Sequence, residues 1–355
     1  MNQPIPARIP GRIPVFGATR QRGLSLVELM IALTLGLIVV GSVIAIFLSS
    51  KQSYGTNTAL GEIQDNSRVA FELLARDIRQ AGLTGCGNNG RVANVLNNGP
   101  NAGGTVDWWA DFNNAIHGYD GGQTDPAVTT GTGIAQRVSG TSSLVLIGAA
   151  PTSLSVASQN SPAANFKLNE STSDLQAGDV IIVCDPDHAA IAQVTNYNNS
   201  NVTLVHDTGN GVATPGNCSK GLGYPTACTT NGNSYDFGPN SQISKLQAVD
   251  WYIGNNPQKG KSLYRLALGS NASTTTAITT AQEMVRNVTD MQIAYHLAGG
   301  TSFVNAATVG TNWNTVDAVQ LQLKFESTDT HASTTANATI SRWLYSTVTL
   351  RNRTN

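Results

Sequence analysis

A long, predominantly apolar stretch near the N-terminus constrains this chain more than any other feature. It runs from Leu24 to Leu48, and after Glu28 no charged residue occurs until Lys51. Because roughly 20 apolar residues suffice for a helix to cross the hydrocarbon core of a bilayer, the stretch predicts a membrane-spanning helix over 24–48. An ionised carboxylate is costly inside hydrocarbon, so Glu28 is a candidate functional residue that requires a partner.

Three other interpretations account for the stretch less completely. A cleaved secretory signal would have a shorter apolar core followed by a small-x-small cleavage site, and no such site follows here. A plain membrane anchor explains the length but neither Glu28 nor the glycine, Gly23, that precedes the run. A buried core helix of a soluble protein is rarely apolar on every face.

The residues around Gly23 resemble the class III signal of type IV pilins and pseudopilins. In that family a basic leader ends in Gly, an apolar residue follows, and Glu is the fifth residue of the mature chain. Here the leader ends at Gly23, Leu24 would become the first residue, and Glu28 the fifth. The usual first residue is Phe, so Leu24 departs from the pattern. The resemblance implies that a prepilin peptidase removes residues 1–23 and N-methylates Leu24.

Charge pairing suggests a role for Glu28 that does not depend on the family name. Cleavage after Gly23 would create a free amine on Leu24. This amine and the Glu28 carboxylate of a neighbouring subunit would carry opposite charges, and pairing would offset the burial cost that each bears alone. We therefore expect Glu28 to be a subunit-assembly contact that sets the axial register between helices packed in a filament.

The distribution of charge predicts the orientation of the chain. The leader contains four arginines and no acid, and few basic residues follow the apolar run closely. This asymmetry places the N-terminus in the cytoplasm and the rest of the chain beyond the inner membrane. The whole chain has 21 basic and 22 acidic residues, so removing the leader leaves no basic surplus that would bind nucleic acid.

The helix is expected to continue as an amphipathic half over 49–82. Arg68, Glu72 and Arg76 are spaced for i,i+4 ion pairs. Gly55 and Gly61 weaken the early part, and Gly82 and Gly85 end the helix. One face, which we expect to pack against a sheet, carries residues three or four apart: Ile63, Ser67, Ala70, Leu74, Ile78 and Ala81.

The sequence of the remaining residues, 83–355, predicts one β-rich head in the periplasm. Short apolar or alternating runs bounded by Gly, Asn and Pro indicate antiparallel strands. Two long segments, 87–140 and 207–242, are rich in Gly and Asn and read as loops. The expected fold class is therefore α+β and type IV pilin-like, with a long N-terminal helix packed on an antiparallel sheet. Predicted strands cover 144–147, 190–194, 202–205, 246–253, 261–266, 316–325 and 343–350, and in each of 175–184 and 283–295 a turn leads into a further strand.

Four cysteines lie in the part expected to be exported. An even number in an oxidising compartment predicts two disulfides, and three pairings are open. We favour Cys218–Cys228, which closes a short loop, and Cys86–Cys184, which ties the helix end to a core strand.

Neither a metal site nor a catalytic site is assigned. The run from Cys184 to His188 matches no standard zinc spacing. A calcium site involving Asp120, Asp125 or Asp185 stays open, although the twelve-residue calcium-loop pattern does not occur. No Gly-x-Ser-x-Gly elbow and no His-Glu-x-x-His motif occurs. We expect no catalysis and no cofactor.

Two segments resemble PilW-type minor pilins in particular. Over 68–86 an Arg-rich helix runs into Ala-Gly-x-x-Gly-Cys, and residues 177–185 read Ala-Gly-Asp-Val-Ile-Ile-Val-Cys-Asp. J-type pseudopilins of type II secretion systems share the helix and are the alternative. A second alternative is a pilus-tip adhesin that binds a surface ligand through its loops, with 207–242 as the candidate segment.

The resemblance implies that the chain helps to prime type IV pilus assembly and so supports twitching motility and adhesion. Its implied partners are other minor pilins, the major pilin, the prepilin peptidase, the inner membrane and the pilus assembly machinery. It would be a single-pass inner-membrane protein before assembly and part of an extracellular pilus afterwards.

Overall fold

The computed structural model describes residue 23 and residues 25–87, 90–208, 213–330, 333 and 338–351. Leu24 and all but the last residue of the predicted leader lie outside these residues. By its internal contacts the chain divides into two compact units, residues 1–54 and 55–355.

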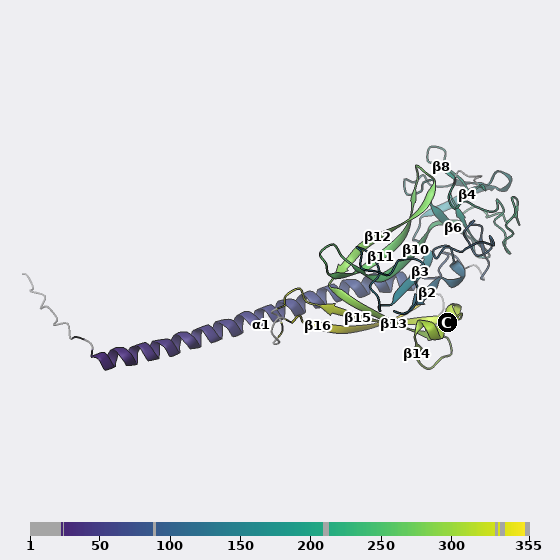
Figure 1. Ribbon diagram of the computed structural model, residues 1–355. Helices are drawn as coiled ribbons and strands as arrows, with labels where there is room; N and C mark the ends of the chain where they lie inside the picture. Colours follow the sequence, from purple (N-terminus) through teal and green to yellow (C-terminus); the bar gives the residue numbers. More distant parts are fainter. Residues whose placement is uncertain are drawn as a thin grey trace, which may run out of the picture. The chain divides into compact units, whose positions relative to one another are not determined.

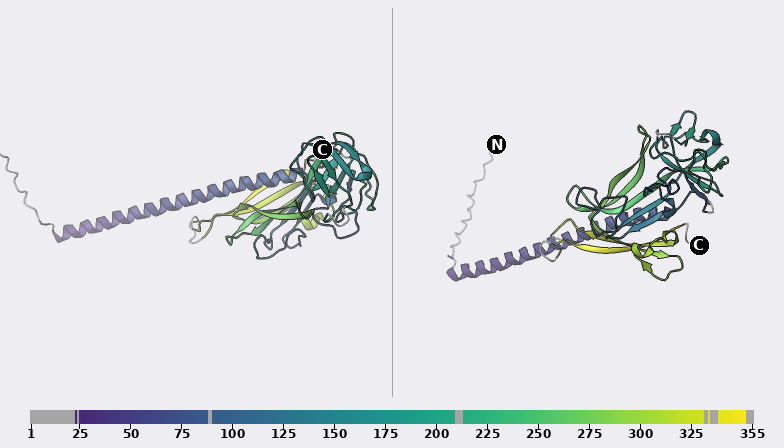
Figure 2. Two further views of the ribbon diagram at one scale, coloured as in Figure 1. Left: turned by 90° about the horizontal axis from the view of Figure 1, so that it is seen from above. Right: turned by 45° about the vertical axis from the view of Figure 1, so that its right-hand side comes forward.

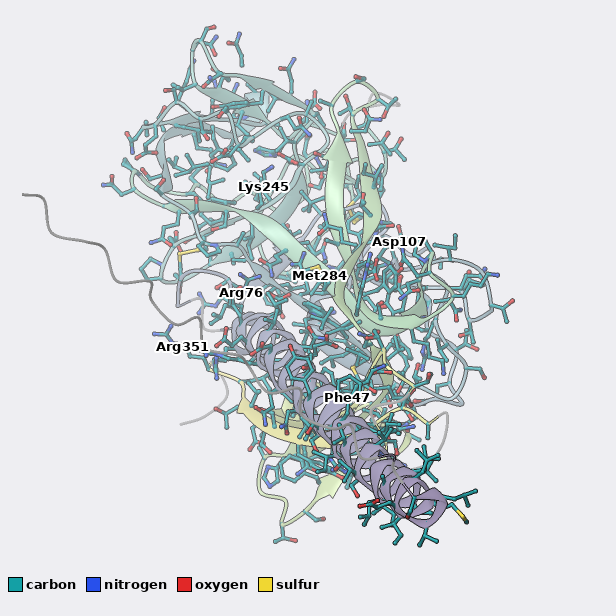
Figure 3. The ribbon with its side chains drawn as sticks, turned by 90° about the vertical axis from the view of Figure 1, so that its left-hand side faces the viewer. Phe47, Arg76, Asp107, Lys245, Met284 and Arg351 are labelled. Carbon is teal, nitrogen blue, oxygen red and sulfur yellow. A yellow bond between two sulfur atoms is a disulfide. The ribbon has the colours of Figure 1, made fainter. Side chains whose placement is uncertain are left out.

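A single helix, α1, extends from Leu26 to Gln80 (Figure 1). Within the first unit its large apolar side chains are between 52 % and 77 % exposed from Leu26 to Leu48. Phe47, labelled in Figure 3, is one of them. By length and composition the helix is able to cross a membrane.

The part of α1 in the second unit has one buried face. All six residues predicted to form it are buried, from Ile63 to Ala81, so the face prediction is confirmed. Gly55 and Gly61 do not interrupt the helix. Arg68 pairs with Glu72 at 3.2 Å, but the expected Glu72–Arg76 pair does not form, because Arg76 Nε lies 3.6 Å from an Asp77 carboxylate oxygen instead.

Twelve strands form a branched sheet around one long strand, β10 (Gln242–Asn255). At its first residues β10 pairs with β4 and β6, and further along with β3 and β11. The strand order is β1-β7-β6-β10-β4-β5-β9-β8, with β2 beside β3 and β12 beside β11. The β1–β7 pair is parallel. The other strands are β1 (Val92–Asn94), β2 (Ile116–Tyr119), β3 (Ser143–Ala149), β4 (Leu154–Asn160), β5 (Asn165–Leu168), β6 (Val180–Cys184), β7 (Ala189–Gln193), β8 (Asn196–Asn198), β9 (Thr203–Val205), β11 (Lys261–Asn271) and β12 (Thr276–Arg286).

Four strands near the C-terminus form a separate antiparallel sheet in the order β14-β13-β15-β16. Their bounds are β13 (Val288–Leu297), β14 (Phe303–Val304), β15 (Val316–Glu326) and β16 (Ser341–Thr349). A short helix, α2 (Ala306–Val309), and three single 3-10 turns, η1 (Phe112–Asn114), η2 (Ser161–Ala163) and η3 (Trp313–Thr315), complete the described elements.

The main core forms where the second part of α1 meets both sheets. Leu74 and Ile78 belong to one buried cluster with Trp251 of β10 and with Leu321 and Phe325 of β15. Figure 1 and the right-hand view of Figure 2 show this part of the helix between the two groups of strands. The architecture confirms the predicted α+β class, with a long helix packed on a predominantly antiparallel β head.

Two parts of the head differ from the prediction. The predicted strands omit β1, β2, β4, β5, β8, β14 and all but the last residues of β12. Their sequences are short or contain few large apolar residues, so they do not stand out from loops. Residues 207–242 are largely irregular as expected, but the segment is not wholly a surface loop. Leu222 and Phe237 are buried in a second core with residues of β4–β7 and β9.

Candidate functional site

Ser25 and Glu28 form a capping box at the start of α1. The Glu28 backbone N–H donates to Ser25 Oγ at 3.1 Å, and the Ser25 backbone N–H donates to Glu28 Oε2 at 3.3 Å. This reciprocal pair satisfies two of the N–H groups that a helix N-terminus leaves unpaired. Glu28 therefore has a local partner within its own chain, which the sequence analysis did not foresee although the Ser-x-x-Glu spacing signals it.

The side chains of the following turns of α1 are almost all apolar. Thr34 Oγ1 donates to the carbonyl oxygens of Met30 and Ile31, and Ser42 Oγ donates to that of Ile38. These hydroxyls are satisfied by the helix itself, as an apolar environment requires. Glu28 is thus the one charged side chain on this apolar helical surface, which suits contact with lipid or with other apolar helices.

Gly23 is under no steric demand in the described structure. A Cβ atom built on it would meet no heavy atom within 4 Å. Glycine is therefore not required at this position by the fold of the chain. The reason for a glycine here must therefore lie in a molecule that acts on this segment.

Asp77 fixes the end of α1 to the large sheet. Its side chain is fully buried, and it accepts hydrogen bonds from Arg265 Nε at 2.9 Å and from the Trp251 indole N–H at 3.1 Å. Gln247 Nε2 donates to the other carboxylate oxygen at 3.2 Å. The donors come from β10 and β11, more than 160 residues away in sequence. A buried carboxylate with charged and neutral donors on both oxygens is satisfied, so its burial is tolerated.

The residues that directly follow α1 also bond to β3. The Gly82 N–H donates to the Ile147 carbonyl at 2.7 Å, and the Ala149 N–H donates to the Leu83 carbonyl at 2.8 Å. Between them lies Gly148, where a Cβ atom would approach the Gln80 carbonyl oxygen to 2.3 Å. Gly82 itself has φ +75°, a conformation that favours glycine at a helix end.

Both disulfides are present with the favoured pairing. Cys86–Cys184 joins the segment after α1 to β6 across 98 residues, and Cys218–Cys228 closes a loop across 10 residues. The first ties the helix end to the core of the large sheet. The second staples the irregular segment that contributes Leu222 to the second core.

The three aspartates considered for calcium serve the chain itself. Asp120 accepts the N–H groups of Ala306 and Ala307 at the start of α2. Asp185 accepts the N–H groups of Asp187 and His188 and the Tyr235 hydroxyl. Among the described residues no group of three or more His, Cys, Asp or Glu is placed to hold a metal ion.

Asp125 belongs instead to a buried group of charges that the sequence did not reveal. It accepts from the Ala127 N–H and from the Ser143 hydroxyl. The carboxyl group of Asp250 on β10 lies beside it, and burial and the charge of Asp125 raise the Asp250 pKa well above its usual value. Arg137 is also buried, and its guanidinium donates to backbone carbonyls, including those of Asp120 and Thr141.

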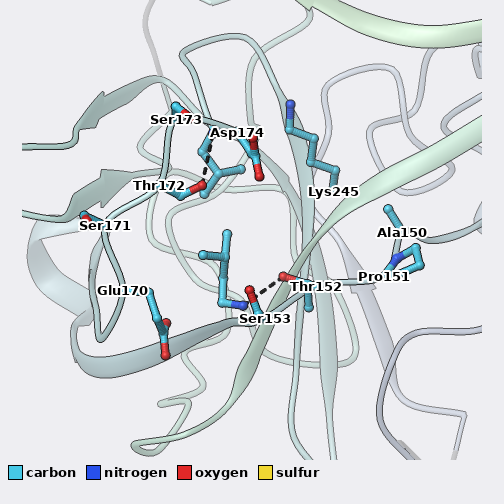
Figure 4. Close-up of a pocket in the computed structure, with 12 residues that line it drawn as sticks. Ala150, Pro151, Thr152, Ser153, Glu170, Ser171, Thr172, Ser173, Asp174 and Lys245 are labelled. Carbon is cyan, nitrogen blue, oxygen red and sulfur yellow. Dashed lines mark hydrogen bonds between the residues drawn. The ribbon is translucent and has the colours of Figure 1, made fainter.

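One hollow in the head is lined mainly by polar side chains. It has a volume of about 660 Å³ and is lined by hydroxyl side chains together with Glu170, Asp174 and Lys245 (Figure 4). Lys245 pairs with Asp179 at 2.9 Å, and Glu170 accepts from the backbone N–H and the hydroxyl of Ser155. No histidine lines the hollow, so its hydroxyls have no imidazole base to activate them as nucleophiles.

Comparison with known proteins first defines the class of protein to which the chain is similar. Residues 18–44 match the prokaryotic N-terminal methylation motif. This match covers the end of the predicted leader and the first part of α1, and with the exposed apolar helix it supports membrane anchoring and association with a pilus. The chain thus has the features of a pilin-like protein, which points to a structural component of a pilus.

A second match, in the C-terminal part of the chain, narrows this class of protein. Residues 250–352 match the family model for type IV pilus-assembly protein W, over the end of β10 and all of β11–β16. The two matches support a PilW-type minor pilin, and the predicted resemblance is confirmed. No curated protein and no solved structure matches the chain.

Proposed function

We propose that the chain is a minor pilin that takes part in priming the assembly of type IV pili, and through them in twitching motility and adhesion. The observation that carries this proposal is a lone acid, Glu28, at the start of an otherwise apolar and exposed helix that continues into a PilW-like head. The PilW match favours the pilus over a type II secretion system.

The proposal gives each part of the chain a role. Residues 1–23 are a leader removed by the prepilin peptidase, which then N-methylates Leu24. Residues 24–48 cross the inner membrane and later form the filament core, 49–82 anchor the helix to the head, and 83–355 form the head in the periplasm. The partners are other minor pilins, the major pilin and the pilus assembly machinery. After assembly the protein is part of the extracellular pilus.

The capping box refines the role of Glu28. In the chain alone its carboxylate accepts the Ser25 backbone N–H. An ion pair with the protonated Leu24 amine of a neighbouring subunit, in which both partners are charged, is stronger than this bond to a neutral N–H. We infer that the carboxylate exchanges its local partner for the amine when the helix enters the filament.

Peptidase processing is tested by intact mass and N-terminal sequencing of membrane-extracted protein, from cells with and without the prepilin peptidase. We expect a start at N-methylated Leu24 only when the peptidase is present. A chain that stays uncut, or is cut beyond Leu48, would remove the pilin assignment.

The assembly role is tested by Glu28→Ala and Glu28→Gln in the native host. We expect both proteins to be inserted and cut but to fail to support piliation, because neither can pair with the amine as a charge. Glu28→Gln keeps a cap acceptor, so it separates loss of charge from loss of the cap. Glu62→Ala, an exposed glutamate of the same helix, is the matched control and should leave pilus counts unchanged. Normal pilus counts in both Glu28 variants would contradict the assembly role.

A further inference from the structure

The imidazole ring of His296, near the end of β13, lies between two oxygen atoms. Its Nδ1 is 2.6 Å from a carboxylate oxygen of Asp317, at the start of β15. Its Nε2 is 3.0 Å from the carbonyl oxygen of Gly300, in the turn that follows β13. The His296 and Asp317 side chains are 26 % and 21 % exposed, so water shields the pair only in part.

A β-bulge in β15 brings Asp317 to the ring. The register of β13 against β15 shifts between His296 and Leu297, which leaves Asp317 as an additional residue on β15. Such a bulge bends the strand and changes the direction of the side chain. The contact therefore depends on the pairing of two strands, and sequence spacing gives no sign of it.

Both oxygen atoms accept hydrogen bonds, and neither can donate one. A neutral imidazole has one N–H donor and one acceptor nitrogen, so it would satisfy one oxygen and turn a lone pair towards the other. Only the imidazolium ion, with an N–H on both nitrogens, satisfies both contacts. The hydrogen bond to Asp317 raises the pKa of His296 above its ordinary value of 6.5, and desolvation of the ring opposes this only in part.

Among the described residues, Asp317 is the charged group that faces the ring. The turn, residues 298–302, and the short helix α2 contain no titratable residue. Strand β14 contributes the ring of Phe303, whose centroid lies 5.5 Å from that of His296. Across β15, the row that starts at His296 ends at Thr349 of β16. The protonation of His296 is therefore governed by its pairing with Asp317.

The turn has few other contacts that order it. Residues 298–302 are exposed and include Gly299 and Gly300, and glycine loses more backbone freedom than any other residue when it is fixed. The strand that follows, β14, pairs with β13 over only two residues. In the described part of the chain, the bond from His296 Nε2 is the only hydrogen bond that a side chain makes to the turn.

We propose that His296 is a pH-sensitive clip on this turn, closed while the ring carries two protons and open when it has lost one to water. The bond to Asp317 is the stronger of the two, because its acceptor is charged. The remaining proton therefore stays on Nδ1, and Nε2 turns a lone pair towards the Gly300 carbonyl oxygen. The turn is released, whereas His296 stays bound to Asp317. This clip goes beyond the proposed role in assembly and does not depend on it.

The direction of the pH dependence follows from the raised pKa of His296. The contribution of the clip is fully present below the pKa of about 6.5 that histidine has in an unfolded chain. It is lost as the pH rises through the higher pKa of His296 in the fold. The turn is therefore most ordered in mildly acidic conditions and opens in alkaline ones.

The test follows the ring and the turn separately, in the full-length protein in detergent. Deuterium exchange at the imidazole carbon between the two nitrogens, measured by mass spectrometry from about pH 5 to about pH 9, gives the pKa of His296. Amide exchange of residues 297–304, corrected for the intrinsic exchange rate at each pH, reports the order of the turn. We expect a pKa above 6.5 and a loss of protection of about three- to tenfold across it.

The turn between β10 and β11 is an internal control. The side-chain oxygen of Asn256 accepts the N–H groups of Gln258 at 3.1 Å and of Gly260 at 2.8 Å. A carboxamide does not titrate, so the corrected protection of residues 256–260 should stay constant over the same pH range.

Two variants assign the effect to the clip. His296→Gln removes the titrating group and should abolish the pH dependence of the turn. Asp317→Asn removes the charged acceptor, so the pKa of His296 should fall and the turn should open at lower pH. Equal thermal midpoints show that both variants are folded.

Three results would overturn the proposal. These are a pKa of His296 at or below 6.5, protection of the turn that changes with pH no more than that of residues 256–260, or the same pH dependence in His296→Gln. The first two are measured on the wild-type protein, so they hold even where a variant fails to fold.

Discussion

Asp250 lies in the middle of β10 with its side chain fully buried, and neither carboxyl oxygen accepts a hydrogen bond of ordinary geometry from the described residues. Asp125 faces it from the 120–130 loop, Arg137 faces it from the loop before β3, and Tyr119, Tyr252 and Tyr295 are the other titratable side chains around it. Desolvation and the Asp125 charge raise the Asp250 pKa, and Arg137 only partly opposes them. When Asp250 is protonated, it can donate to the Asp125 carboxylate. The three side chains Asp250, Asp125 and Arg137 then have no net charge.

This raised pKa makes stability fall as pH rises. In the unfolded chain Asp250 ionises near pH 4, whereas in the fold it keeps its proton. Below the pKa of Asp250 in the unfolded chain, its contribution to stability is fully present. As the pH rises from there to the pKa in the fold, this contribution is lost by up to about 1.4 kcal/mol per pH unit. Asp250→Asn keeps a donor to Asp125 and should remove this dependence. Thermal midpoints of the full chain against pH measure the difference, and parallel curves for both proteins would contradict it.

His206 works in the opposite sense and sets the pH range of that measurement. Its ring is fully buried, and desolvation lowers its pKa from 6.5 to about 4. Between these values the unfolded chain binds a proton that the fold excludes, so stability rises with pH. Above pH 6.5 this contribution is constant, so a difference in slope there between the wild type and Asp250→Asn reports Asp250.

At the scale of elements, Asp77 joins α1 to β10 and β11. Asp77→Ala would leave Arg265 largely buried without its carboxylate and the Trp251 N–H without its acceptor. Breaking a buried ion pair from one side costs about 3–5 kcal/mol. Glu72→Ala, which removes an exposed pair with Arg68, should cost at most about 0.5 kcal/mol. Urea unfolding of both variants measures the contrast.

Rescue separates the buried charge from simple loss of packing. Adding Arg265→Met to Asp77→Ala removes the unpaired charge, and we expect it to recover part of the lost free energy of unfolding. An Asp77→Ala variant as stable as Glu72→Ala would show that this network does not hold the helix to the sheet.

The contact between α1 and β3 depends on the lack of a side chain at Gly148. An alanine Cβ would lie 2.3 Å from the Gln80 carbonyl oxygen, so helix or strand must shift. We expect Gly148→Ala to lower the free energy of unfolding by about 1–3 kcal/mol. Gly269→Ala in β11, where a Cβ meets nothing within 4 Å, should instead be neutral or stabilise by up to about 1 kcal/mol. Equal effects of the two substitutions would contradict the steric argument.

Elements with a strong local pattern were predictable, and long-range partners were not. The buried face from Ile63 to Ala81 follows from spacing alone, as does the alternation in β15. Strand β12 has mostly small and polar residues, and its pairing with β11 gives it structure. Asp77 and Asp250 look like ordinary surface acids in sequence, because their partners lie far along the chain. At the candidate site, Glu28 was found from its charge, whereas its bond to Ser25 required the structure.

At the scale of the whole molecule, the two disulfides restrict the unfolded chain to different extents. Cys86–Cys184 closes a loop of 98 residues and Cys218–Cys228 one of 10. Loop-closure entropy predicts a stabilisation of about 4.7 kcal/mol for the first and somewhat under 3 kcal/mol for the second. The first crosslink also connects the helix end to a central strand, so its loss should affect the cooperative unfolding of the whole head.

We therefore expect the paired variant Cys86→Ala and Cys184→Ala to lower the urea midpoint more than Cys218→Ala with Cys228→Ala. Limited proteolysis distinguishes where each acts. The first variant should become sensitive throughout the head, whereas the second should be cleaved first within 207–242, because only that segment loses its staple. A larger loss from the 218–228 pair would mean that it stabilises the packing of Leu222 and Phe237 in the folded state, and not mainly by restricting the unfolded chain.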